Sequence, residues 1–193
     1  IQLGEFKSAE KYYKEAIDIF SEVGNKRGIA EVEGGLGIIH MEQSNNEASI
    51  EYFTSALEEF ETVKDQRHLA IYYLKRSQVY VKEENFKAVE DDILKSLEYS
   101  KSINDKSLEF QGNIYKVIND IKLSNSDKIK VVTGINKLND ESLSDEDQAL
   151  YYYHLWRLGG KPEDKENAVK LYQKLDKQKP SYFYKKYLAE LES

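Results

Sequence analysis

One helical segment recurs in this chain at a fixed spacing of 40 residues. The first copy covers residues 4–20 (GEFKSAEKYYKEAIDIF), where small and apolar side chains follow the i, i+3, i+4 spacing of one face of a helix. Its small, aromatic and small positions return twice at the same offset: Ala9, Tyr13, Ala16; Ser49, Phe53, Ala56; Val89, Ile93, Ser96. Self-similarity at a period of roughly 20–50 residues is typical of stacked repeats. The chain is therefore predicted to be an array of helical units, each contacting its neighbours.

The remaining sequence divides into helical patterns separated by short polar turns. Besides 4–20, the predicted helices are residues 28–43, 47–63, 68–82, 86–103, 107–123, 127–138, 145–158, 162–177 and 181–191. The two prolines, Pro162 and Pro180, stand at predicted helix starts, where the missing N–H does not disrupt a hydrogen bond. The predicted fold class is all-α, a right-handed α-solenoid of antiparallel helix pairs.

The repeat register weakens towards the C-terminus. Residues 124–126 are predicted to form a turn, and the polar residues 139–144 interrupt the array. We predict 40-residue repeats over residues 1–138, the first of them incomplete, and a degenerate final repeat with a C-terminal capping helix over residues 139–193. Because the chain starts at Ile1, halfway through a repeat, we interpret it as part of a longer protein.

Composition limits the classes of function. The chain has 28 Lys and Arg against 35 Asp and Glu, a net charge of −7, which argues against direct nucleic-acid binding by this segment. The absence of cysteine excludes disulfides and thiolate chemistry, and is consistent with a cytoplasmic location. No apolar run reaches the roughly 20 residues that a membrane-spanning helix needs, so no membrane partner is expected.

No catalytic or metal-binding constellation is recognisable. His40, His68 and His154 share no metal-ligand spacing, and no Ser-His-Asp order or pair of catalytic carboxylates can be argued. We expect no enzyme activity, no metal and no cofactor.

Three glycines inside one predicted helix need an explanation. Gly34, Gly35 and Gly37 each cost the helix about 1 kcal/mol relative to alanine. They indicate either close helix packing at Gly37 or a local weak point. A phosphate-binding loop is the third reading, but EGGLG matches neither glycine-rich phosphate-binding spacing and no strand precedes it.

The small–aromatic–small pattern resembles the second helix of the tetratricopeptide repeat. The first-helix half of that motif is matched by Leu36-Gly37 with His40 and by Ser77 with Tyr80, and Pro180 stands where the family's terminal proline does. The period of 40 exceeds the usual period of about 34. Long repeats of this kind are similar to those of Rap/PlcR-type bacterial intracellular peptide-pheromone receptors and of Pins/LGN-type scaffolds.

The resemblance implies a concave groove, lined by first helices, that holds a peptide or a segment of a partner protein. The implied partner-binding residues are Ile38, Met41, Ile71, Leu74, Gln78, Val81, Gln111, Ile114 and Ile118. The alternative is that some of these side chains belong to the core, with the groove register displaced by one residue.

Three further alternatives stay open at this stage. The chain can be the ligand-sensing domain of a pheromone receptor, or the regulatory segment of a multidomain signalling enzyme. The C-terminal aromatic cluster can cap the array or form a homodimer contact; its members are Tyr151, Tyr152, Tyr153, Trp156, Tyr182, Phe183, Tyr184 and Tyr187.

Overall fold

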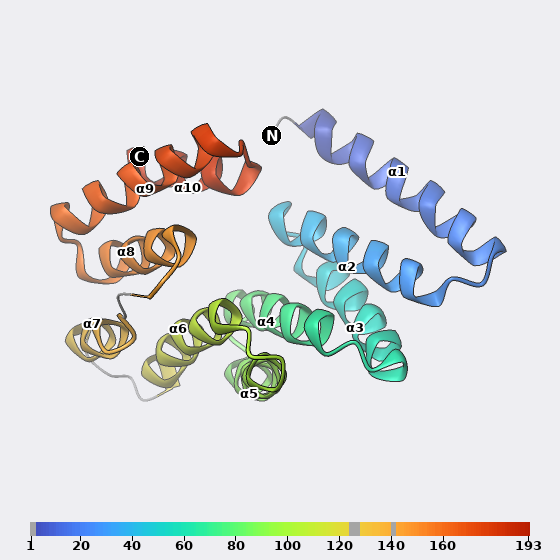
Figure 1. The fold of residues 1–193 in the computed structure, drawn as a ribbon, viewed down its shortest axis with the longest axis horizontal. Helices are drawn as coiled ribbons and strands as arrows, with labels where there is room; N and C mark the ends of the chain where they lie inside the picture. Colours follow the sequence, from blue (N-terminus) through green and yellow to red (C-terminus); the bar gives the residue numbers. More distant parts are fainter. Residues whose placement is uncertain (1–2, 124–127, 140–141) are drawn as a thin grey trace. The chain divides into compact units, whose positions relative to one another are not determined.

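The computed structural model describes residues 3–123, 128–139 and 142–193 of the chain. These residues form ten α-helices, and among them there is no strand (Figure 1). The helices are α1 (Leu3–Glu22), α2 (Lys26–Glu42), α3 (Asn46–Val63), α4 (Gln66–Lys82), α5 (Phe86–Ser102), α6 (Lys106–Leu123), α7 (Lys128–Asn136), α8 (Asp145–Gly159), α9 (Pro162–Gln178) and α10 (Tyr182–Glu192). The predicted all-α class of antiparallel helix pairs is confirmed. The turn predicted at 124–126 lies outside the described residues, and none of the described helices is long and apolar enough to cross a membrane.

The turns between the first six helices share one backbone geometry. A residue with positive φ occurs every 20 positions, at Gly24, Ser44, Lys64, Glu84 and Asn104. The amide of each following residue closes the helix end with a hydrogen bond to a carbonyl five positions earlier, as Asn25 does to Phe20 at 2.8 Å. This left-handed closing residue is the common way for a helix to end. Every helix–turn unit in this part of the chain is therefore 20 residues long.

The residue after each turn caps the next helix. Side-chain oxygens of four of these residues accept a hydrogen bond from the amide three positions later: Asn25, Asp65, Asn85 and Asp105. Such a cap satisfies one of the amides that the first helical turn leaves without a partner. Turn and cap together set the register of each helix before any packing is considered.

The chain divides into two compact units, Ile1–Gly112 and Asn113–Ser193, called unit 1 and unit 2 below. The division between the two units falls inside α6. The boundary predicted from the sequence, between residues 138 and 139, marks where the 40-residue repeats give way to a degenerate repeat, and it stays a prediction. In unit 1 each helix packs on the next, from α1 to α5. Its core combines aliphatic, small and aromatic side chains, among which Ala56, Phe53 and Phe60 are fully buried.

The three glycines of α2 each face an aromatic ring from a different helix. A Cβ atom on Gly34 would lie 2.1 Å from Tyr72 Cζ of α4, and one on Gly37 would lie 2.7 Å from Phe53 of α3. A Cβ atom on Gly35 would lie 2.9 Å from Tyr13 of α1. All three glycines therefore allow close helix packing, the explanation that the sequence suggested for Gly37.

Unit 2 has a core of aromatic side chains from α8, α9 and α10. The Tyr187 ring stacks on Tyr172 with centroids 4.9 Å apart and meets the edge of Tyr153 at 4.7 Å. Tyr172 and Tyr153 are almost fully buried. Much of the C-terminal aromatic cluster thus packs within unit 2, while the capping role and the homodimer contact stay predictions.

A buried histidine makes unit 2 sensitive to acid. Burial lowers the pKa of His154 from 6.5 to about 4, and the charge of Arg157 acts in the same direction. Its Nε2 atom is buried without a hydrogen-bond partner, and its ring meets Tyr115 and Tyr153 edge-on. Between pH 6.5 and 4 the unfolded chain binds a proton that the folded chain does not, so the free energy of unfolding decreases as the pH falls, by roughly 3 kcal/mol in total.

The measurement is urea unfolding followed by the fluorescence of Trp156, the only tryptophan of the chain and a residue of unit 2. The midpoint is expected to fall steeply between pH 7 and pH 4.5 in the wild type and less in His154→Phe. Equal pH dependence in the two proteins would rule out His154 as the source.

Candidate functional site

The predicted groove depends on α2 and α4 being neighbours. The two helices contact each other, and Figure 1 shows both between α1 and α5 in unit 1. Lys82 at the end of α4 donates a 3.2 Å hydrogen bond from Nζ to the carbonyl of Met41 near the end of α2. A cation at carbonyls of a helix C-terminus is favourable. The two first helices of adjacent pairs therefore form one continuous surface.

The structure separates the predicted groove residues by exposure. Partly exposed are Ile38 on α2, Ile71, Gln78 and Val81 on α4, and Gln111 and Ile118 on α6. Buried are Met41, Leu74 and Ile114, which expose 5%, 1% and 0% of their surface. These three buried side chains could contact a partner only if the surrounding helices moved apart. Gln111 lies in unit 1 and Ile118 in unit 2, so the surface described below is limited to α2 and α4.

Accessible positions form a stripe with one spacing on both helices. On α2 the stripe is Glu31, Ile38 and Glu42; on α4, 40 residues later, it is Ile71, Gln78 and Lys82. Steps of seven and four residues keep side chains on one helix face. Sequence reasoning missed Glu42 and Lys82, although each stands four residues after a predicted groove residue. The stripe therefore carries apolar, amide and charged groups together, and we call it the α2–α4 stripe.

Ile38 and Ile71 give the α2–α4 stripe a firm apolar base. Both rest on the core cluster of unit 1 and keep part of their surface accessible. A side chain held from below by a packed core loses little freedom when a partner covers it, which favours binding. The two isoleucines are the part of the stripe best suited to hold apolar side chains of a partner.

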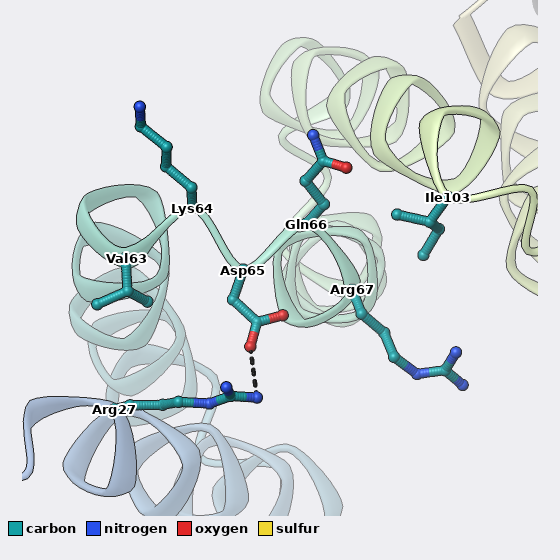
Figure 2. A pocket seen from close by; sticks show the side chains of 7 residues that line it. All are labelled: Arg27, Val63, Lys64, Asp65, Gln66, Arg67 and Ile103. Carbon is teal, nitrogen blue, oxygen red and sulfur yellow. Dashed lines mark ion pairs between the residues drawn. The ribbon is translucent and has the colours of Figure 1, made fainter.

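A second surface feature lies where the ends of four helices, α2, α3, α4 and α5, meet. It is an open cavity of about 390 Å³ whose lining includes Arg27, Lys64, Asp65 and Arg67. Figure 2 shows Arg27 of α2 pointing towards Asp65, while Arg67 of α4 points away from it. The Arg27 Nη2 atom lies 2.8 Å from Asp65 Oδ2.

The Asp65 carboxylate forms hydrogen bonds and an ion pair with residues of this junction. It accepts bonds from the amide of His68 at 3.2 Å and from His68 Nδ1 at 2.9 Å, besides pairing with Arg27. Partial burial acts to raise the pKa of Asp65, but the His68 bonds and the Arg27 charge outweigh it, so the pKa lies below its ordinary value.

The same ion pair recurs one repeat later. Arg67 Nη1 lies 3.1 Å from Asp105 Oδ2, so an arginine at the start of one first helix pairs with the capping aspartate of the next. Both arginines are more than half exposed, and exposed pairs contribute roughly 0–1 kcal/mol. The cavity of Figure 2 is therefore best understood as the gap around a link between repeats. Its lining offers neither an activated nucleophile nor an acid–base pair.

Metal chemistry finds no support in the described part of the chain. There, no group of three or more His, Asp or Glu side chains is placed to hold an ion. His40 stacks on Tyr52 and His68 on Phe60, with centroids 5.3 and 4.6 Å apart, so each contributes a flat ring to packing.

Comparison with known families gives one match. A family model described as Tetratricopeptide repeat matches residues 1–22, which include α1. A comparison with curated proteins finds no match. Together with the all-helical repeat architecture, the match supports the tetratricopeptide repeat superfamily. Repeats of this type typically mediate protein–protein interactions and are generally non-enzymatic, which suggests an interaction scaffold.

Proposed function

We propose that this tetratricopeptide-like array is a non-enzymatic scaffold that binds an extended segment of a partner protein along the α2–α4 stripe. The observation that carries the proposal is the placement of Ile38 and Ile71. They lie on contacting helices, are supported by the core and remain partly exposed. Several modest contacts with a few dominant anchors are the usual energetics of such binding.

Gln78 supplies the polar component of the proposed site. Its side-chain amide can donate and accept at once, which suits the N–H and C=O groups of an extended backbone. It lies seven residues, or two helical turns, after Ile71 on the same face of α4. Glu42 and Lys82 extend the stripe with opposite charges, so a partner segment with apolar residues beside both signs of charge fits best.

The test uses peptides selected by display against the whole chain, with affinities measured by fluorescence anisotropy. We expect Ile71→Glu to weaken a selected peptide at least tenfold, because it places an unpaired charge on the apolar base of the site. Gln78→Ala is expected to cost about 1 kcal/mol, roughly fivefold in affinity.

The control is Glu90→Ala, an exposed position on α5 outside the stripe. Circular dichroism establishes that all three variants remain folded. Selected peptides that bind Ile71→Glu and Gln78→Ala as tightly as wild type would refute this site.

Three more specific functions are also proposals. A pheromone receptor, a Pins/LGN-type adaptor and the regulatory segment of a signalling enzyme all use a helical groove, and they differ in the ligand and in the attached domains. The stripe geometry is compatible with each of them. A cytoplasmic location and membership of a longer regulatory protein likewise stay predictions from sequence.

A further inference from the structure

Unit 2 contains an apolar cavity that is separate from the α2–α4 stripe. It measures about 260 Å³ and lies between α7 and the junction of α8 with α9. Ile129, Val132 and Thr133 line it from α7, and Leu158, Gly159 and Lys161 line it from the junction. Ile129 is 70% exposed at the edge of this apolar cavity.

Gly159 brings the two walls of this cavity together. A Cβ atom on Gly159 would lie 3.2 Å from Cγ2 of Val132, so the end of α8 approaches α7 with almost no space to spare. The following Gly160 ends α8 in the left-handed conformation, with φ of 72°. The absence of a side chain at Gly159 therefore lets the end of α8 pack closely against Val132 of α7.

One wall of the cavity belongs to a basic segment, although the chain as a whole is acidic. Residues 128–138 (KIKVVTGINKL) contain three lysines and no acidic residue, in a chain of net charge −7. Lys130 on α7 and Lys137, just after its end, are exposed; neither lines the cavity itself, but Lys130 follows the lining residue Ile129 in sequence. The exposed Lys161 adds a third charge from the opposite wall, next to Glu163 and Asp164 in the first turn of α9. In the described part of the chain these three lysines form no ion pair.

We propose that this cavity is a docking site for an acidic segment of a partner protein, which inserts one bulky apolar side chain between α7 and α8. The volume falls just below the roughly 300–1,000 Å³ of small-molecule sites and suits a single leucine or phenylalanine anchor. Anchors of this kind, in a pocket with a polar rim, dominate protein interfaces. Charge complementarity selects the partner, because Lys161 in the lining and the exposed Lys130 next to Ile129 in sequence attract acidic groups flanking the anchor.

The probe is a fluorescein-labelled helical peptide with Glu on most positions and Leu and Phe on one face. Two matched peptides replace either all Glu by Lys or the Leu and Phe by Ala. We expect the acidic apolar peptide alone to bind, to shift the methyl resonances of Ile129, and to lose most of its affinity when salt rises from 50 to 200 mM. The protein variants are Ile129→Asp, expected to weaken binding at least tenfold, and Lys161→Glu, expected to weaken it several-fold.

Ile19→Asp is the matched control, since Ile19 is an equally exposed isoleucine, 60% accessible, on α1 of unit 1. It should bind the probe like wild type, and so should Ile71→Glu, which separates this site from the α2–α4 stripe. Equal binding of the basic peptide, or unchanged affinity in Ile129→Asp, overturns the proposal. The proposal is also overturned if the wild type forms a dimer that does not bind the probe and if Ile129→Asp dissociates that dimer. The occupant of the cavity would then be a second copy of the chain.

Discussion

Gly34→Ala is expected to destabilise unit 1 by about 3 kcal/mol or more, although the same change at an exposed helical site stabilises by about 1 kcal/mol. The new methyl group would lie 2.1 Å from Cζ and 2.4 Å from Oη of Tyr72. Tyr72 has no free space to move into, because it is 7% exposed and its ring stacks against Phe53 and Phe60. Relief requires α2 and α4 to separate, at the cost of the packing that joins them.

Urea unfolding followed by far-UV circular dichroism measures this loss, while Trp156 fluorescence reports on unit 2 separately. Gly35→Ala is the control in the same helix, since its methyl group meets only the far end of the partly exposed Tyr13. In a Tyr72→Leu background, Gly34→Ala should cost much less, because the obstructing ring is gone. A Gly34→Ala protein as stable as wild type would contradict the packing argument.

Arg76→Ala is expected to cost 3–5 kcal/mol, roughly the effect of removing one partner from a buried ion pair. The Nε and Nη2 atoms of Arg76 each lie 2.8 Å from an oxygen of Asp92, and Nη1 lies 2.8 Å from Thr54 Oγ1. One guanidinium thus joins α3, α4 and α5. Asp92 is 4% exposed, so the substitution leaves a buried carboxylate without its ion-pair partner.

The exposed pair of Arg67 with Asp105 supplies the control. Arg67→Ala should cost less than about 1 kcal/mol, because its side chain is 66% exposed and water replaces the lost partner. The double variant Arg76→Ala, Asp92→Ala should be more stable than Arg76→Ala alone. Similar losses for Arg76→Ala and Arg67→Ala would show that burial does not strengthen the first pair.

Acid should partly rescue Arg76→Ala. Burial acts to raise the pKa of Asp92, and without the guanidinium only the charge of Lys95 still opposes it. A folded pKa above the unfolded value means that the folded variant gains a proton first as the pH falls. The stability deficit relative to wild type should therefore be largest near neutral pH and shrink towards pH 4.

The helix boundaries could be predicted because their determinants are local. The observed helices start and end within one or two residues of the predicted ones in almost every case, and the turn and capping residues explain why. Asn or Asp at 25, 45, 65, 85 and 105 follows each closing residue. This 20-residue spacing was present in the sequence beside the 40-residue period, and it identifies every helix start in unit 1 after α1.

The groove was harder to predict because adjacent positions on a helix differ by about 100° in direction. The predicted stripe combined Ile38 with Met41 and Ile71 with Leu74, which are three residues apart and equally apolar. In the structure Met41 and Leu74 are buried, while Glu42 and Lys82 share the accessible face with Ile38 and Gln78. Hydropathy alone does not separate a supported, accessible isoleucine from a buried methionine.

The sequence by itself determined the all-helical array, the length of its units and the absence of a recognisable catalytic motif, since repeat period, caps and turns act within one or two helical turns. Only the tertiary structure decided which aromatic ring fills the space above each glycine of α2 and which residues stay accessible on α2 and α4. It also decided that Lys161 and apolar side chains of α7 and α8 line one cavity. These features depend on the distance and rotation between helices. Both are set by the combined volume of side chains that lie far apart in the sequence.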